Sequence, residues 1–357
     1  LIKKISINNL TIDSLVIIFL SHIYYKITFV NFLQGEFLLI NQIKAGNVTS
    51  TLFSVESPTY VLIGLLLGID NIDNFKLLIY LITLISFGII VINIQFLNSY
   101  STLFLFGGWL VTCSWYIGYV DAVSVMLIVL ITRNIIQENN GKLNLLIYIT
   151  LLTINHSAIS LAIIIISLLF IKKGLLKKYL VIAIISQLLG NGVIQYYLNY
   201  IGFSGRGRFR FIFNDNIIET ATSFVGNNIL IILWSGFLGV SFLIVLASNM
   251  LLWVDVSKVL LGTLIAIFFT AISLDTSRIF SLLVIPIILN TLQMCSKKVE
   301  LNKYISIIYT FSLILFFFIG VYHFFGEVYK SSPMINDETF YDLIVRMVNS
   351  LMSGIWK

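Results

Sequence analysis

Apolar runs of about twenty residues, separated by short polar loops, recur along the whole chain. A helix of about 20 apolar residues is long enough to cross the hydrocarbon core of a bilayer. The 357 residues are 59% hydrophobic and only 11% charged, whereas a soluble domain carries roughly a quarter charged residues. So few charges do not cover a surface that faces water. The sequence therefore predicts an all-α polytopic membrane protein and argues against a cytosolic enzyme, a nucleic-acid binder or a disordered chain.

The apolar runs predict about eleven transmembrane helices, with additional interfacial or re-entrant helices. Residues 60–69 form a run that is too short to span and is bounded by Pro58 and Asp70. The predicted crossings are residues 14–32, 76–97, 102–118, 122–136, two shorter helices within 143–171 that meet at Asn155-His156, 179–199, 228–249, 259–274, 279–294 and 304–322.

These crossings divide the chain into a membrane part and a tail. Residues 1–322 form the predicted transmembrane domain, with outer loops at 33–75 and 200–227. Residues 323–357 form an extracytoplasmic tail that contains one amphipathic helix near 338–351. The first apolar run is not followed by a small-residue cleavage site, so we expect it to be retained as a helix.

The distribution of Lys and Arg predicts the orientation, because cytoplasmic loops carry an excess of both. With the N-terminus in the cytoplasm, twelve of the 22 basic residues fall on the cytoplasmic side. Counting 60–69 as a full span would move the basic clusters at 172–178 and 297–303 outside. The Ile-, Asn- and Lys-rich composition is typical of an AT-rich bacterial genome, so we expect the protein in the bacterial inner membrane. With the predicted orientation, the candidate active site lies on the extracytoplasmic side.

Glu36 is the first candidate catalytic residue. It lies in an amphipathic stretch that runs from Gln34 to Gly46, directly after the first predicted crossing. A carboxylate held at the membrane surface by such a helix can accept a proton from a hydroxyl group. The alternative is a solvated charge on an interfacial helix, a common arrangement.

Asp121 and His156 are predicted at the same outer membrane level. Asp121 follows the aromatic stretch 115–119 and stands at the head of a predicted helix, so it is a candidate site residue, a helix N-cap, or both. The aromatic side chains either stack on a sugar ring or form an interfacial belt. His156 is either a polar turn residue or a hydrogen-bond donor to a sugar or phosphate.

The segment from Gly202 to Arg210 places Arg206, Arg208 and Arg210 in one outer loop, against the positive-inside rule. The planar fork of arginine suits phosphate, so the loop is a candidate phosphate site. Binding to anionic lipid headgroups is the alternative. Asp275 and Arg278 lie between two later crossings, where they either join the site or form a salt bridge that ties the helices together.

The order of these features resembles the GT-C superfamily of membrane glycosyltransferases, over roughly residues 12 to 165. The acidic first outer loop from Glu36 to Gly46 is followed by the short segment Ser57-Pro58-Thr59-Tyr60-Val61-Leu62. Gly118-Tyr119-Val120-Asp121 looks like the Gly-Tyr-Tyr-Asp element of oligosaccharyltransferases. Asp275-Thr276-Ser277-Arg278 is similar to the acid-x-Arg element of related mannosyl- and arabinosyltransferases. This chain departs from the family in having one acid, and not two adjacent acids, in its first outer loop.

The resemblance implies a membrane enzyme that uses a sugar on undecaprenyl phosphate and a glycan or lipid-linked acceptor, in contact with membrane lipids. Glu36 would be the base and Asp121 would assist it or hold the acceptor. The departing lipid phosphate would be bound by Arg206, Arg208, Arg210 and Arg278. Because the second acid is missing, no metal ligand set is assigned, and a divalent cation is the one cofactor that the resemblance leaves open.

Two other functions remain open at this point. An O-antigen or exopolysaccharide repeat-unit polymerase would use the arginine loop on undecaprenyl pyrophosphate, and would not need Glu36 or Asp121. A transporter or flippase is the third interpretation, but the charges lie at one surface and no internal repeat is visible, in contrast to the midplane sites of transporters.

Overall fold

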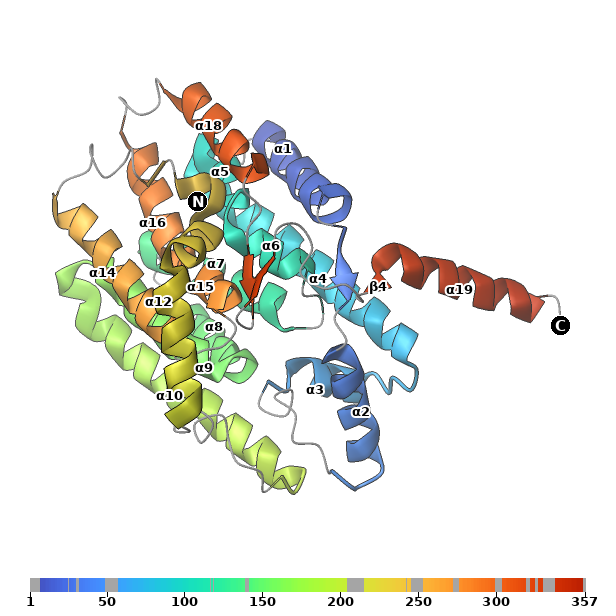
Figure 1. Ribbon diagram of the computed structural model, residues 1–357. Coiled ribbons are helices and arrows are strands. Elements are labelled where there is room, and N and C mark those ends of the chain that lie inside the picture. Colours follow the sequence, from blue (N-terminus) through green and yellow to red (C-terminus); the bar gives the residue numbers. More distant parts are fainter. Residues whose placement is uncertain are drawn as a thin grey trace.

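The protein's computed structural model describes residues 7–24, 26–29, 32–48, 57–115, 117, 119–138, 141–203, 215–241, 243–244, 253–271, 276–298, 304–318, 322–324, 327–329 and 338–355. The described chain is a helical bundle with two very short antiparallel strand pairs (Figure 1). The predicted all-α class is therefore confirmed.

The first half of the chain forms the centre of the bundle and, at one end of it, a small group made of α2, α3 and the start of α4. Helix α4 begins where the Asn71 side chain accepts a hydrogen bond from the Asp73 amide at 2.7 Å, an N-cap arrangement. The elements are α1 (Ile7–Ile18), the π-helix η1 (Phe19–Tyr24), β1 (Thr28–Phe29), α2 (Phe32–Lys44), α3 (Thr59–Leu66), α4 (Ile72–Ile94), the 3₁₀ helix η3 (Gln95–Tyr100), α5 (Ser101–Leu105), α6 (Gly108–Trp115), α7 (Asp121–Ile136), α8 (Lys142–Asn155) and α9 (Ser157–Leu169).

The second half wraps around this centre and ends in a helix that projects from the bundle (Figure 1). Its elements are α10 (Lys173–Tyr200), α12 (Asp215–Phe237), the 3₁₀ helix η4 (Leu238–Val240), α14 (Trp253–Thr270), α15 (Thr276–Leu283), α16 (Ile285–Ser296), α18 (Ile305–Phe318), β2 (Tyr322–Phe324), β3 (Glu327–Tyr329), β4 (Glu338–Thr339) and α19 (Phe340–Ile355). Strand β2 pairs with β3, and β4 returns to pair with β1.

Few described helices have the length of a complete membrane crossing. Ile72–Leu105 and Gly174–Tyr200 are long and apolar enough, and Ser277–Leu283 with Ile285–Ser296 makes a third if this pair, bent by 42°, is one span. The other apolar helices in the described chain are shorter. The predicted count of about eleven transmembrane helices is therefore not supported.

The count differs between sequence and structure because an apolar run in sequence does not show where its helix breaks. The run 102–118 is divided at Phe106-Gly107 into α5 and α6, and the run that starts at Ser14 leaves its helix at Tyr24. The division of 143–171 at His156, the short helix after Pro58 and the amphipathic helix of the tail are as predicted.

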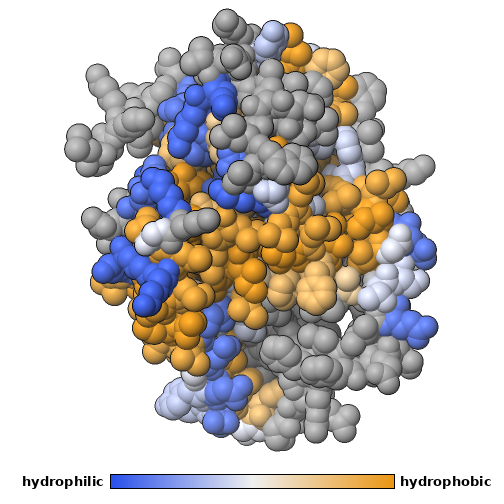
Figure 2. Space-filling view, turned by 90° about the vertical axis from the view of Figure 1, so that its left-hand side faces the viewer, coloured by the Kyte–Doolittle hydropathy of each residue, from blue (hydrophilic) through white to orange (hydrophobic). Residues whose placement is uncertain are grey.

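An apolar belt on the outside of the bundle supports a membrane location. Figure 2 shows the left-hand side of Figure 1, where α10 and α14 lie: apolar residues cover much of its middle, and polar residues lie above them, below them and at both edges. A soluble monomer rarely exposes such a continuous apolar patch. The strongly exposed apolar side chains on these two helices include Leu180, Val181, Ile184, Leu188, Leu189, Leu260, Leu264 and Phe268.

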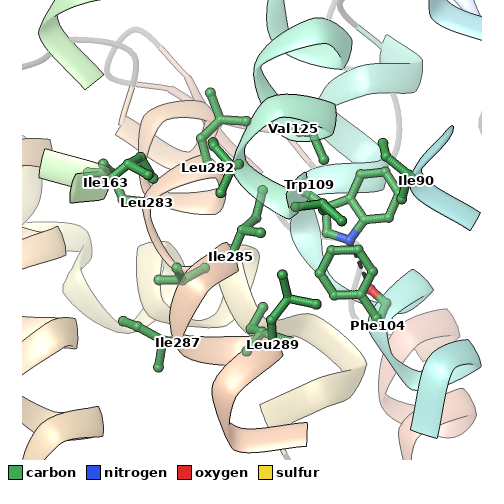
Figure 3. Packing of buried hydrophobic residues seen from close by; sticks show 14 of the residues in the cluster. Ile90, Phe104, Trp109, Val125, Ile163, Leu282, Leu283, Ile285, Ile287 and Leu289 are labelled. Atoms are coloured by element: carbon green, nitrogen blue, oxygen red, sulfur yellow. Dashed lines mark hydrogen bonds between the residues drawn. The ribbon is translucent and has the colours of Figure 1, made fainter. Parts of the chain in front are cut away.

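The interior is built around α6, whose residues from Gly108 to Trp115 are all buried. Trp109 stacks on Phe104 with ring centroids 5.0 Å apart, and its indole N–H donates to the Phe104 carbonyl at 2.8 Å (Figure 3). Ile285 and Leu289 of α16 lie near the same aromatic pair. This core fixes the relative positions of α6, α7, α15 and α16. Two of these helices, α7 and α15, carry Asp121 and Arg278, which are described below.

Gly108 brings α6 into backbone contact with α12. A Cβ atom at Gly108 would lie 1.8 Å from the Ser235 carbonyl oxygen, so the helices would have to separate. We expect Gly108→Ala to lower the free energy of unfolding by about 1–3 kcal/mol through overpacking, measured by denaturant titration in detergent. Gly88→Ala is the control, because nothing lies within 4 Å of its Cβ position. Equal stability of the two variants would contradict this close helix contact.

A smaller apolar cluster at one end of the bundle joins α2 and α3 to the start of α4 (Figure 1). The buried side chains of Leu39, Tyr60 and Phe75 meet there, and Leu343 of α19 is inserted among them. Arg346 of α19 also donates to Asp73 at 3.1 Å. The first turns of α19 therefore anchor the tail to the cluster of α2, α3 and the start of α4.

Candidate functional site

A buried ion pair joins Asp121, the first residue of α7, to Arg278 in the first turn of α15. The guanidinium donates from Nε to one carboxylate oxygen at 2.5 Å and from Nη2 to the other at 3.0 Å. Both side chains are almost completely removed from solvent. Two parallel charge-assisted hydrogen bonds fix the plane of the guanidinium as well as its position.

The structure excludes one of the alternatives for Asp121, that of a helix N-cap. Val120 occupies the N-cap position and makes no side-chain hydrogen bond, while Asp121 lies inside the first turn. The carboxylate is still favoured there by the positive end of the helix dipole. Of the two alternatives for Arg278, a salt bridge that ties helices together is present, and its partner is Asp121, which lies far away in the sequence.

An aromatic ring covers the other side of this pair. The Arg278 guanidinium carbon lies 3.7 Å from the centroid of the Tyr119 ring, an attractive cation–π arrangement. The Tyr119 carbonyl accepts a hydrogen bond from the Tyr60 hydroxyl at 3.3 Å. Tyr119 thus connects the ion pair to helix α3, and the predicted aromatic stretch before Asp121 takes part in the site.

Glu36 is buried on α2, with 4% of its surface exposed. This excludes the interpretation of Glu36 as a solvated charge on an interfacial helix. Its buried carboxylate oxygen Oε2 has no hydrogen-bond partner among the described residues. Burial raises the pKa of the Glu36 carboxyl well above its ordinary value, because the charged form loses its hydration.

Tyr60 is influenced by the charges of both Glu36 and Asp121. Burial raises the pKa of the Tyr60 phenol, and the negative charges of Glu36 and Asp121 raise it further. The phenol is therefore a hydrogen-bond donor at neutral pH and is close enough to both acids to sense them. Sequence analysis did not assign Tyr60 a role, although the short segment after Pro58 that contains it was recognised.

His156 is buried at the break between α8 and α9. The preceding residue, Asn155, donates from Nδ2 to the Val120 carbonyl at 3.0 Å and to the Ser124 hydroxyl at 2.8 Å. The α8–α9 break therefore holds the beginning of α7. This places His156 in the segment that supports Asp121.

Four predicted site residues lie outside the described chain: Arg206, Arg208, Arg210 and Asp275. The described chain stops at Phe203 and resumes at Asp215, and it resumes again at Thr276. The predicted roles of the arginine loop and of Asp275 therefore remain predictions.

A strand ladder links the tail to the same site. Thr28 and Phe29 of β1 pair with Thr339 and Glu338 of β4. Phe29 also forms a bridge with Ile117, which bridges in turn to Tyr119. A continuous series of backbone pairings therefore runs from the tail to Tyr119, whose ring covers Arg278. No sequence pattern indicated these pairings.

Comparison with known proteins gives no relative for this arrangement: no protein-family model, no curated protein and no solved structure matches the chain.

The described site is suited to proton and anion chemistry. Glu36 supplies a carboxyl group that binds or releases a proton, and Arg278 supplies a cation that Asp121 holds in place. Within the described residues, no group of three or more His, Cys, Asp or Glu side chains is placed to hold a metal ion. The divalent cation that the resemblance leaves open therefore finds no such group of ligands in this part of the chain.

Proposed function

We propose that the protein transfers a sugar from a polyprenyl-phosphate-linked donor to a glycan or lipid-linked acceptor at the outer face of the membrane. The observation that carries the proposal is the buried Glu36 carboxyl, whose Oε2 has no hydrogen-bond partner among the described residues. Its charge acts on the Tyr60 phenol, and Tyr60 in turn donates to Tyr119, whose ring covers Arg278 of the Asp121–Arg278 pair. Buried ionisable groups near a membrane are costly and are functional candidates by default.

In the proposed reaction, the acceptor hydroxyl oxygen bonds to the anomeric carbon of the sugar while the bond from that carbon to the phosphate oxygen breaks. The hydroxyl proton passes to the ionised Glu36 carboxylate, and the electron pair leaves with the polyprenyl phosphate. Arg278 and the outer-loop arginines Arg206, Arg208 and Arg210 stabilise the charge on the departing phosphate. Tyr60 and Asp121 position the groups around the acceptor.

The proposal places the bundle in the bacterial inner membrane, with the amino-terminal end of the chain in the cytoplasm. The exposed apolar belt and the position of basic residues support this placement. In this arrangement the shorter apolar helices count among about eleven crossings. Glu36, Asp121 and Arg278 then lie together at the extracytoplasmic level.

The test is turnover by the purified protein in lipid nanodiscs. Polyprenyl phosphates that carry a panel of radiolabelled sugars are supplied with membrane glycan as acceptor, and released polyprenyl phosphate is measured. Polyprenyl-pyrophosphate-linked oligosaccharides are supplied in parallel. Consumption of the phosphate-linked donors supports the transferase, whereas consumption of only the pyrophosphate-linked substrates would identify a repeat-unit polymerase.

A further inference from the structure

A second buried acid, Asp13 of α1, lies away from the site described above. Its side chain is 0% exposed. One carboxylate oxygen accepts from Gln95 Nε2 at 2.8 Å and the other from Thr102 Oγ1 at 2.5 Å. Both donors follow the C-terminal end of α4. The apolar cluster that joins α2 and α3 to α4 lies at the N-terminal end of the same 23-residue helix. At 1.5 Å per residue the two regions are separated by about 30 Å along the helix.

The chain around Asp13 is interrupted and rich in oxygen atoms. Helix α4 gives way to η3, where Asn98 has a non-helical backbone with φ 54° and ψ −125°. The Tyr309 hydroxyl of α18 donates to the Ser99 carbonyl, and the Tyr309 phenol is close enough to Thr102 and Asp13 to interact with both.

Tyr100 adds an oxygen without a partner to this region. Its ring is fully buried, and its hydroxyl has no hydrogen-bond partner among the described residues. The Tyr100 phenol is also close enough to Tyr309 to interact with it. A buried hydroxyl that lacks a partner costs about 1–3 kcal/mol, and a ligand bound at the Tyr100 oxygen would lower this cost.

Among the described residues, the charge around Asp13 is unbalanced. The carboxylate lies beside the C-terminal end of α4, where the helix dipole is negative, and two negative groups at one buried place repel each other. In the described chain no Lys, Arg or His forms an ion pair with Asp13. A bound cation would remove this imbalance.

We propose that Asp13, with the oxygens of Thr102, Tyr100, Tyr309 and the interrupted η3 backbone, binds an alkali-metal cation. Carboxylate, hydroxyl and carbonyl oxygens are the ligands of hard cations, and membrane proteins place Na⁺ at interrupted helices where carbonyls and helix C-terminal ends converge. A single carboxylate suits a monovalent ion better than Mg²⁺, which dehydrates reluctantly. The site is independent of the proposed sugar transfer.

The experiment measures the thermal unfolding of the detergent-solubilised full chain in NaCl, KCl or choline chloride at constant ionic strength. We expect the unfolding midpoint to rise saturably, by about 3 °C, when Na⁺ or K⁺ replaces choline, because a ligand that binds only the folded state stabilises it. Asp13→Asn is expected to lose this shift. Asp255→Asn, which removes an acid from a partly exposed pair with Lys258, is expected to keep it.

Equal midpoints of the unaltered protein in all three salts would overturn the proposal, as would a full shift in Asp13→Asn. If Asp13→Asn does not fold, Thr102→Val keeps the carboxylate and removes one oxygen ligand. We then expect a higher Na⁺ or K⁺ concentration for the half-maximal shift. Binding of ²²Na⁺ to the unaltered protein provides a direct measurement, and bound ²²Na⁺ that unlabelled NaCl or KCl does not displace contradicts the site.

Discussion

The Glu36→Gln variant is expected to lose sugar transfer by roughly 100-fold or more, because an amide cannot accept the proton of the acceptor hydroxyl. Glutamine keeps the size and the polarity of the side chain, so the buried environment of α2 remains filled. The measurement is release of polyprenyl phosphate under the nanodisc conditions described above. Glu219→Gln is the matched control, because Glu219 is exposed on α12. Near-normal transfer in Glu36→Gln would contradict the role of Glu36 as the base and would favour the polymerase and transporter interpretations.

The same variant is expected to be more stable than the unaltered protein at alkaline pH. Burial raises the pKa of Glu36 in the folded state, so the folded protein holds this proton more tightly than the unfolded chain does. The contribution of Glu36 to stability is therefore present below about pH 4.3, the unfolded value, and is lost as the pH rises through the folded pKa. Glutamine removes this loss.

The stability measurement is a series of unfolding midpoints from acidic to alkaline pH. We expect Glu36→Gln and the unaltered protein to have similar midpoints at pH 4 and to diverge as the pH rises, with the variant higher. Glu219→Gln should follow the unaltered protein throughout. Loss of activity together with gained stability is typical of a functional residue held in an unfavourable environment, whereas a structural residue would lose both.

Local properties of the sequence were sufficient to predict much of the fold. Apolar length predicted α4, α7 and α10, and the polar pair Asn155-His156 predicted the division between α8 and α9. Pro58 predicted the start of α3, because proline is tolerated where a helix begins and its N–H would be unsatisfied. These features depend on neighbouring residues only, and a single sequence contains them.

The contacts of the site could not be predicted in the same way. Asp121 and Arg278 are separated by 157 positions, and both were selected for their charge and predicted membrane level, but no local pattern pairs them. The break at Phe106-Gly107 lies beside the close approach of Gly108 to Ser235, a contact between segments that are far apart in the sequence. The pairing of β1 with β4 joins residues from opposite ends of the chain, so it also required the tertiary structure.

Breaking the Asp121–Arg278 pair is expected to have the largest effect on stability. Asp121→Leu leaves a buried guanidinium without its counter-ion, and Arg278→Met leaves a buried carboxylate, so each should cost about 3–5 kcal/mol of unfolding free energy. The double variant replaces both charges by apolar groups and is expected to be more stable than either single variant, since removing a whole buried pair is often neutral. Denaturant titration in detergent gives the four free energies.

The pair of Lys258 and Asp255 provides the control for this cycle. It is a partly exposed i,i+3 pair at 3.5 Å, for which a coupling of at most about 1 kcal/mol is expected. If Asp121 and Arg278 show the same small coupling, the buried pair is not the structural centre of the site. A stable double variant that has lost sugar transfer would separate the contribution of the pair to stability from its contribution to transfer, because the fold would then persist without the charges.

Arg278→Lys tests whether the plane of the guanidinium matters. Lysine keeps the charge, but it does not keep the two-pronged hydrogen bonding or the stack on Tyr119, so the variant is expected to lose transfer.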